Sequence, residues 1–356
     1  MSKVFGATAP ELRERIGVLA QVIRVDSFVE TQGTARGARR LRLVNGGGIE
    51  VEVHPDRALD IGQVTIDGIP ISWMSPTGIA APEFYEPQGQ GWLRTFGGGL
   101  LATCGLDTFG PPGEDAGETL GQHGRIGTRP AELIRAEATA DGVVVEGLIR
   151  QANVFGENLL LRRRISSAAG SDTVVVEDTV TNEGFAESPH MILYHANLGW
   201  PLLDADSTIE IPSSSATPRD ADAEPGLATR GEVGPPVPGF REQVYLHEFD
   251  EAAAEGHSVG HSDVQVRVTN PRLGVRFELA FSAVQLPYLY QWKMVGQGHY
   301  VLGIEPSNCR NVFGRKAARE AGELPVLAAG ESVSYRLEFR LRRVESSTAR
   351  FEGETA

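Results

Sequence analysis

DTVVVEDTVTNEG, residues 172–184, places Val174, Val176 and Val180 an even number of residues apart and ends in a turn that contains Gly184. Successive side chains of a β-strand point to opposite faces, so apolar residues at every second position predict a strand with one buried face. The stretch is too short, and too rich in β-branched residues, to favour a helix. It predicts a half-buried strand of an antiparallel sheet.

The same period of two recurs along the chain. It is present in GIEVEVHP (48–55), GVVVEGLIRQANVF (142–155), NLLLRRRISS (158–167), VQVRVTNP (264–271), GVRFELAFS (274–282) and SVSYRLEFRLRRV (332–344). Helical periodicity is weak, and its best example is APELRERIGVLAQV (9–22), which follows a cap-like Thr8. These patterns predict an all-β protein, a large antiparallel β-sandwich with few short helices.

A change of composition marks the one long excursion between strands. PSSSATPRDADAEPGLATRGEVGPPVPGF (212–240) is too polar to form a core element by itself, and it predicts a linker or a surface loop over about 205–240. Sandwiches take their core from strands far apart in sequence, which favours a loop within one domain. We therefore expect an N-terminal segment (1–40) packed on the sandwich, a single domain (41–345) and a C-terminal tail (346–356).

Composition excludes several classes of function. The net charge is −14 and the pI is about 5.1, so phosphate backbones and anionic lipid surfaces are repelled on average. No apolar stretch reaches the roughly 20 residues needed to span a bilayer, and the first residues lack a signal-peptide core. Cys104 and Cys309 cannot form a disulfide framework. We expect a cytoplasmic protein without nucleic-acid or membrane partners, and a homodimer is compatible with the sequence.

Six segments carry more detail than strand formation requires. They are NGGGIEVEVHPDRALDIGQVTIDGIPISWMSP (45–76), GWLRTFGGGLLATCGL (91–106), LGQHGRIGTRPAEL (120–133), SPHMILYHANLGWPLL (188–203), YLYQWKMVGQGHYVLGIEPSN (288–308) and LPVLAAGESV (324–333). In this order they resemble the aldose 1-epimerase or galactose mutarotase superfamily, and most closely its DUF4432 branch. The resemblance implies the galactose mutarotase-like supersandwich fold and a small-molecule sugar as ligand, with no cofactor.

Three residues are implied as catalytic. Glu305 in GIEPSN resembles the glutamate that removes the proton from the anomeric hydroxyl, and burial suits it to this task because burial raises a carboxyl pKa. His123 in QHGR resembles a histidine that contacts the sugar near its ring oxygen. The general-acid histidine of the family stands four residues before an Asn-Leu pair, where this chain has Leu193. His195, two residues further along the strand, could present an imidazole to the same cavity.

His190 should point away from that cavity and fits a histidine of the turn after Pro189. His195 as a purely structural residue remains the alternative to its catalytic role.

Further residues are candidates for binding the sugar. Their side chains offer hydrogen bonds or an apolar face, although each charged group could instead form an internal ion pair: Arg57, Asp60, Arg125, Asn197, Gln291 and Trp292. Of the four tryptophans, Trp73, Trp92, Trp200 and Trp292, we expect one or two at the site and the others in the core.

Two other patterns are discounted. FGGGL and NGGG lack the lysine and the helix of a phosphate-binding loop, so they predict turns. His257 and His261 have the spacing of a helical metal pair, but the glycines around them oppose a helix, and we expect no metal site.

The resemblance implies an aldose 1-epimerase-like isomerase in which Glu305 and a histidine, His195 or His123, act as base and acid. Because the histidine at position 193 is missing, a non-catalytic sugar-binding or regulatory module on the same fold stays open. Another carbohydrate epimerase or a lyase would also suit a glutamate base with histidine and arginine partners.

Overall fold

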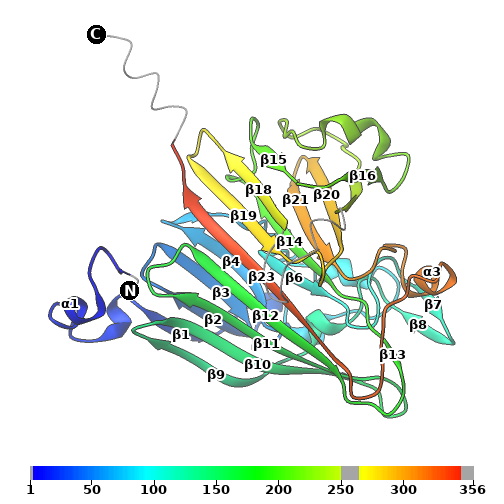
Figure 1. The fold of residues 1–356 in the computed structure, drawn as a ribbon, viewed down its shortest axis with the longest axis horizontal. Coiled ribbons are helices and arrows are strands. Elements are labelled where there is room, and N and C mark those ends of the chain that lie inside the picture. Colours follow the sequence, from blue (N-terminus) through cyan, green and yellow to red (C-terminus); the bar gives the residue numbers. More distant parts are fainter. Residues whose placement is uncertain (1–2, 250–263, 346–356) are drawn as a thin grey trace, which may run out of the picture.

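The computed structural model describes residues 3–249 and 264–345 and consists mainly of two large antiparallel sheets (Figure 1). Eleven strands form the first sheet, in the order β1-β2-β3-β4-β6-β14-β21-β20-β17-β16, with β5 paired to β4. Eight strands form the second, in the order β15-β18-β19-β23-β12-β11-β10-β9. The predicted all-β sandwich is confirmed.

Each of the seven predicted alternating runs forms a strand, and the structure has further strands besides these. In the eleven-stranded sheet they are β1 Arg24–Val29, β2 Arg39–Val44, β3 Ile49–His54, β4 Asp60–Ile66, β5 Ile69–Pro70, β6 Leu101–Cys104, β14 Leu193–Gly199, β16 Ser215–Pro218, β17 Gln243–Glu248, β20 Tyr288–Gly296 and β21 His299–Ser307. In the eight-stranded sheet they are β9 Glu132–Thr139, β10 Gly142–Ala152, β11 Asn158–Ala168, β12 Thr173–Asn182, β15 Thr208–Glu210, β18 Val264–Asn270, β19 Val275–Phe281 and β23 Ser332–Arg343. Two small pairs join β7 Gly113–Asp115 to β8 Glu118–Leu120 and β13 Ser188–Pro189 to β22 Val326–Leu327.

Strand β12, which contains the alternating valines, lies in the middle of the second sheet between β11 and β23. Val174, Val176 and Val180 are buried, as their spacing predicts. Asp178 occupies the same face, and its burial is compensated by Arg163 of β11, whose Nε and Nη2 donate to its two carboxylate oxygens at 2.9 and 2.7 Å. The guanidinium also donates to Asp60 Oδ1 at 3.1 Å and so links the two sheets.

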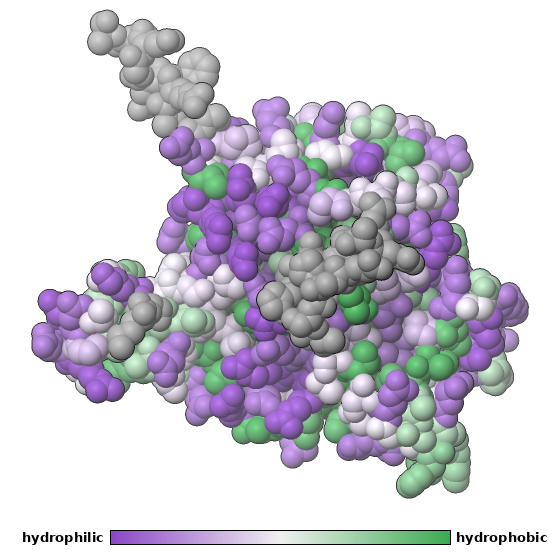
Figure 2. Space-filling model, in the orientation of Figure 1, coloured by the Kyte–Doolittle hydropathy of each residue, from purple (hydrophilic) through white to green (hydrophobic). Residues whose placement is uncertain are grey.

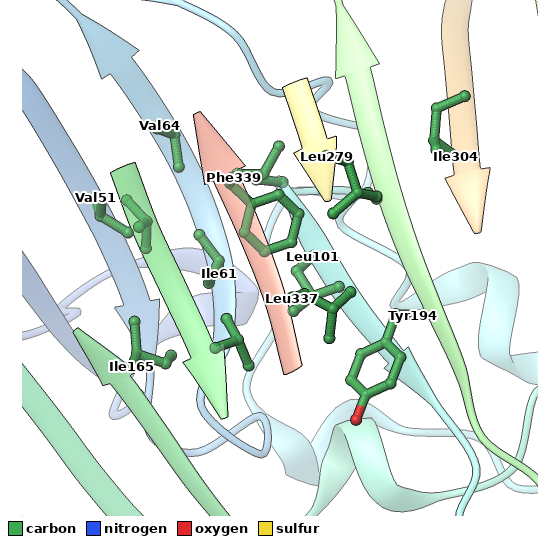
Figure 3. Packing of buried hydrophobic residues seen from close by; sticks show 14 of the residues in the cluster. Val51, Ile61, Val64, Leu101, Ile165, Tyr194, Leu279, Ile304, Leu337 and Phe339 are labelled. Atoms are coloured by element: carbon green, nitrogen blue, oxygen red, sulfur yellow. The ribbon is translucent and has the colours of Figure 1, made fainter. Parts of the chain in front are cut away.

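The main core lies between the sheets (Figure 3). Val51, Ile61 and Leu101 come from the eleven-stranded sheet, and they meet Leu337 and Phe339 of β23 from the other sheet. All are at most 1% exposed, which is the packing expected of facing sheets about 10 Å apart. This core fixes which face of each strand looks inward.

The eleven-stranded sheet is also covered on part of its second face. A smaller apolar cluster lies there, and its buried members include Cys104 of β6, Leu193 of β14, Val244 of β17 and Tyr290 of β20. These strands are therefore buried on both sides, one side by the sandwich core and the other by loops. A large cavity opens on this second face.

Helices are few and short in the described residues. They are α1 Ala9–Arg13, α3 Arg315–Glu320 and the 3₁₀ turns η1 Leu19–Gln21, η2 Gly33–Ala35, η3 Pro82–Phe84, η4 Gly91–Arg94, η5 Ile126–Thr128 and η6 Glu224–Thr229. The predicted N-terminal helix is confirmed but ends early, since only α1 with its Thr8–Glu11 capping box and the separate turn η1 form.

The segment over 205–240 has more structure than its composition predicts. It supplies β15 to the edge of one sheet, β16 to the edge of the other, and the 3₁₀ turn η6 after them. Ile209 and Val233 are each 7% exposed and join the main core, and these two anchors explain why so polar a segment is ordered. Each sheet also takes strands from both halves of the chain, so the segment does not separate two independent sheets.

The N-terminal residues contribute to the sandwich as well as covering it. Val4, Leu12 and Ile23 join the main core, and β1 forms the end strand of the eleven-stranded sheet. The C-terminal tail at 346–356 lies outside the described residues. Most of the surface seen in Figure 2 is hydrophilic, as expected for the outward faces of such strands. No helix among the described residues is long and apolar enough to span a membrane.

Replacing Arg163 with methionine should strongly destabilise the fold, because Asp60 and Asp178 would stay buried without their cation. We expect a loss of about 3–5 kcal/mol in the free energy of unfolding, measured by urea denaturation at neutral pH. Arg162→Met is the control, since the Arg162 side chain is 58% exposed and its ion pair with Glu146 should contribute less than about 1 kcal/mol. Equal losses in the two variants would contradict the inter-sheet role of Arg163.

Candidate active site

A large cavity, with a volume of about 870 Å³, opens on the second face of the eleven-stranded sheet. Its floor is formed by residues of β14, β17, β20 and β21. The loops at 73–77, 90–96, 110–111, 122–123 and 312–313 form the walls. Such a volume is near the upper end of the roughly 300–1,000 Å³ typical of small-molecule sites.

Glu305 lies on the floor of this cavity, on β21, and is only 5% exposed. Its Oε1 has no hydrogen-bond partner among the described residues. Burial, reinforced by the charge of Glu242, raises the pKa of Glu305 well above the usual carboxyl value, and Arg219 opposes this shift only in part. A buried carboxyl with an unused oxygen is chemically suited to exchange a proton with a ligand.

The position of the Glu305 carboxyl depends on a glycine two residues earlier in the strand. A Cβ atom at Gly303 would lie 2.3 Å from Glu305 Oε1 and 3.0 Å from the Trp292 Cβ. Trp292 is the partner of Gly303 on β20. The absence of a side chain at 303 therefore lets the carboxyl fold back along its own strand beside the indole.

His195 of β14 lies next to this carboxyl. Its Nε2 is 3.2 Å from Glu305 Oε1, but the arrangement is not that of a hydrogen bond, and its buried Nδ1 has no partner in the described residues. Burial, with a contribution from His123, lowers the pKa of His195 to about 3, so the imidazole is neutral at pH 7. The close approach allows one proton to pass between the two groups, which should titrate as a pair.

His123 faces the same cavity from the loop before η5. Its backbone is held at a φ of 56° by hydrogen bonds from His123 N to Gly110 O and from Gly105 N to His123 O. The Gly110 N–H also approaches His123 Nδ1 at 3.4 Å, and this contact assigns the ring proton to Nε2. Burial lowers the pKa of His123 to about 4, so His123 is a neutral hydrogen-bond donor at pH 7.

Aromatic rings surround the two histidines. Trp292 is edge-on to His195 at 5.4 Å between centroids, and Trp92 lies 4.6 Å from His123 and stacks on Phe96 at 4.1 Å. Trp73 also lines the cavity and meets Trp292 edge-on. Trp200 is 66% exposed and takes no part. Indole faces of this kind pack well against the C–H groups of a sugar ring.

Two charged residues of the cavity were missed by the sequence analysis. Arg219 follows β16 and Glu242 precedes β17, and Arg219 Nη2 donates to Glu242 Oε1 at 2.8 Å. Both lie in or beside the polar 205–240 segment, in which no residue matches a motif. The only available signal was a charged residue directly after β16 and another directly before β17.

Arg57 and Asp60 do not line the large cavity, contrary to prediction. They border a separate space of about 10 Å³ beneath Trp92 and Phe96. Asp60 accepts hydrogen bonds from Arg163, Thr103 N and Thr103 Oγ1. It therefore forms an internal ion pair, which was the alternative to sugar binding. Arg57 is buried and donates to the Ala80 carbonyl at 3.2 Å.

Arg125 also lies outside the cavity lining, although it is two residues from His123. Its guanidinium donates to Glu118 Oε1 at 2.6 Å and lies 3.6 Å from Asp107 and 3.7 Å from Glu157. These carboxylates draw the side chain away from the ligand space. Arg125 stabilises the loop that carries His123, and this was its alternative interpretation.

Asn197 and Gln291 are structural for different reasons. Asn197 Nδ2 donates to the carbonyls of Gly99 and His195 at 3.0 and 2.9 Å, which fixes the strand on which His195 lies. Gln291 adjoins Trp292 in sequence and therefore points to the opposite face of β20. There it bonds to His247 at 3.1 Å and to the Arg230 carbonyl at 2.8 Å.

His190 is also structural. Its ring nitrogens bond to the Leu106 carbonyl at 3.0 Å and the Tyr335 hydroxyl at 2.9 Å, away from the cavity. His257 and His261 lie outside the described residues. Within residues 3–249 and 264–345, no group of three or more histidine, cysteine or acidic residues has the arrangement of a metal site.

A family model described as a domain of unknown function, DUF4432, matches residues 35–341. The chain belongs to the DUF4432 family. No curated protein matches the sequence. The matched range of this DUF4432 chain includes every residue of the cavity lining.

Solved structures of mutarotase-like proteins share the fold. A protein from Klebsiella pneumoniae subsp. pneumoniae MGH 78578, named as a candidate aldose 1-epimerase, has a TM-score of 0.83 at 23% identity, covering 93% of this chain and 88% of its own. A galactose mutarotase-like protein from Clostridium acetobutylicum has a TM-score of 0.66 at 12% identity, with coverage of 91% and 100%. Galactose 1-epimerase from Lactobacillus acidophilus NCFM has a TM-score of 0.58 at 15% identity, with coverage of 91% and 100%. The DUF4432 chain therefore has the galactose mutarotase-like β-sandwich fold.

His195 and His123 should remain neutral from about pH 8 to about pH 5.5, because both pKa values lie below the ordinary value of about 6.5. Imidazole ¹⁵N shifts, assigned with His195→Asn and His123→Asn, should stay constant over this range. The depressed values also mean that protonation favours the unfolded chain, so their contribution to stability is complete above about pH 6.5 and decreases below it. A ¹⁵N titration near pH 6.5 for either ring would contradict its desolvation.

Proposed function

We propose that this DUF4432 protein binds a free sugar in the large cavity and interconverts its anomers, as an aldose 1-epimerase-like isomerase. The observation that carries the proposal is the pair formed by Glu305 and His195, 3.2 Å apart on the floor of an aromatic cavity. Opening a sugar ring requires a base at the anomeric hydroxyl and an acid at the ring oxygen. This pair, holding one proton between its members, supplies both.

The two proton transfers of the proposed reaction balance within this pair. In the reactive form Glu305 is a carboxylate and His195 is protonated. Glu305 accepts the proton of the C1 hydroxyl, His195 gives its proton to the ring oxygen, and the C1–O5 bond breaks to leave the free aldehyde. The pair then returns to the neutral form favoured by burial. Rotation about C1–C2 and the reverse transfers give the other anomer.

His123 has a different task in this scheme. A neutral imidazole cannot readily give up its remaining proton, but its Nε2–H can donate a hydrogen bond to a sugar oxygen. The rings of Trp92 and Trp292 would hold the sugar by its apolar face. No group outside the chain is needed for these steps.

Saturation-transfer exchange NMR tests the proposal with a panel of free aldoses: galactose, glucose, fucose, rhamnose, glucuronate and sulfoquinovose. We expect faster anomer exchange for at least one sugar, and Glu305→Gln or His195→Asn should reduce it by about 10²–10⁴-fold. His123→Asn should cost less, because it removes a hydrogen bond rather than a proton carrier. Loss of exchange in His123→Asn with full exchange in His195→Asn would transfer the acid role to His123.

A non-catalytic sugar-binding module on the same fold is the second candidate, favoured by the presence of Leu193 where the family has a histidine. It predicts line broadening of one sugar without faster anomer exchange. Full exchange in Glu305→Gln on an accepted sugar would refute the proposed mechanism.

Gly303→Ala tests the geometry of the base without removing it. The new Cβ would overlap Glu305 Oε1, so the carboxyl must leave its place beside Trp292 and anomer exchange should fall about tenfold or more. Gly234→Ala is the matched control, because a Cβ there meets no atom within 4 Å. Exchange unaffected in Gly303→Ala would show that the carboxyl acts from another position.

A further inference from the structure

Arg219 and Glu242 form a charged wall beside the catalytic pair. Arg219 Nη2 donates to Glu242 Oε1 at 2.8 Å, and Arg219 Nε donates to Asp220 Oδ2 at 2.7 Å. Both Arg219 and Glu242 line the cavity that contains Glu305. Arg219 is the only lysine or arginine in the lining formed by the described residues.

A continuous set of contacts connects this wall to Glu305. Trp292 Nε1 donates to Glu242 Oε2 at 3.0 Å, and Trp292 is paired with Gly303, the residue that makes room for the Glu305 carboxyl. The indole is also edge-on to His195. Glu242 therefore acts on the site in two ways, through its charge and through the orientation of the indole.

The other titratable groups around the cavity are mostly uncharged at neutral pH. His195 and His123 are neutral, and burial raises the pKa of the Cys104 thiol on β6 and of the Tyr290 phenol on β20. His299 of β21 lines the outer part of the cavity. Among the residues that line the cavity, the formal charges that act on Glu305 thus come mainly from Arg219 and Glu242.

We propose that Arg219 and Glu242 are opposing positioning residues of the proposed site, Arg219 favouring the ionised, base-competent form of Glu305 and Glu242 favouring its protonated form. The inference rests on the proposed function for its meaning in catalysis, but it concerns a property of the free protein. A cation near a carboxyl stabilises the carboxylate, and an anion destabilises it. Because the two charges are bonded to each other, removing either one leaves the other uncompensated and strengthens its effect.

The direction in which each substitution should shift the pKa of Glu305 follows from these charges. Arg219→Gln leaves Glu242 unopposed, so the pKa of Glu305 should rise further, and the falling limb of the pH–rate profile, where the pair loses its one proton, should move to higher pH. Glu242→Gln leaves Arg219 less compensated, so the pKa should fall and the falling limb should move to lower pH. Each shift should be about 0.5–1 pH unit, or about threefold to tenfold in rate on the limb.

The experiment measures the ionisation of Glu305 directly in the sugar-free, full-length protein. Glutamate labelled with ¹³C at the side-chain carboxyl is incorporated, and the Glu305 signal is assigned by its absence in Glu305→Gln. Its titration midpoint is then compared among wild type, Arg219→Gln, Glu242→Gln and Arg219→Lys. The lysine variant retains the charge and should restore most of the wild-type midpoint.

Control variants separate the effect of charge on the Glu305 midpoint from a general disturbance of the structure. Glu177→Gln and Arg336→Gln break a similar ion pair, 2.7 Å long, on the outer face of the other sheet and should leave the midpoint unchanged. Glu242→Gln keeps an oxygen that can accept the Trp292 N–H, whereas Glu242→Leu loses both charge and acceptor. A shift shared by both variants reports charge, and an additional rise in KM in the leucine variant reports the indole.

Opposite shifts in Arg219→Gln and Glu242→Gln support the inference even if no sugar is ever turned over. Shifts in the same direction, or midpoints equal to that of the wild type, overturn it even if anomer exchange is fast. If Arg219→Gln fails to fold, the comparison of Glu242→Gln with wild type and with Arg219→Lys still decides the sign. The outcome is thus separate from that of the proposed function.

Discussion

The burial of one sheet on both faces is the constraint on which the rest of the structure depends. Strands β6, β14, β20 and β21 pack one face against the sandwich core and the other against the loops that enclose the cavity. Because side chains alternate, each residue of these strands belongs either to the core or to the site. Tyr194 of β14 is in the core, bonded to Asp178 at 2.8 Å, while His195, the next residue, faces Glu305. This alternation determines which residues of these strands face the cavity.

The same alternation explains which sequence predictions held. Strand formation around 172–184 could be predicted because its valines repeat with a period of two, and the all-β class followed from many such runs. Gln291 and Trp292 could not both face a ligand from adjacent positions of one strand, and the structure places only Trp292 in the cavity. Arg57, Asp60 and Arg125 differ in kind, since a charged residue beside a motif gives no indication of its partner. Asp60 is paired with Arg163, which also binds Asp178, and Arg125 is paired with Glu118. Each partner is distant in sequence or lies on another strand.

There is a physical reason why the sequence did not predict the two charged residues of the cavity wall. Arg219 directly follows the edge strand β16 within a polar, proline-rich segment whose composition indicates a loop, and Glu242 lies just after this segment, directly before β17. Ordering of that segment depends on Ile209 and Val233, two apolar residues among many polar ones. Strand β16 pairs with β17, which in turn pairs with β20, and this pairing brings the charged wall to the cavity. Local composition does not contain this information, because the partner strand β20 lies outside the segment in sequence.

Burial sets the protonation states of Glu305 and His195, and it also makes their ion-pair form costly. Removing Glu305 from water favours the protonated acid, and removing His195 from water favours the neutral base, so the cavity holds the pair in its neutral form. In the proposed mechanism, ring opening must start from the ion-pair form, which is the costlier one in an apolar cavity. A bound sugar can lower this cost, since its hydroxyl groups supply hydrogen bonds to the carboxylate that the protein leaves unmade at Oε1. Arg219 and Glu242 then act on the same balance from the wall. A site of this kind gains reactivity from a ligand that completes its hydrogen bonding, and an apolar molecule of equal size would leave the pair neutral.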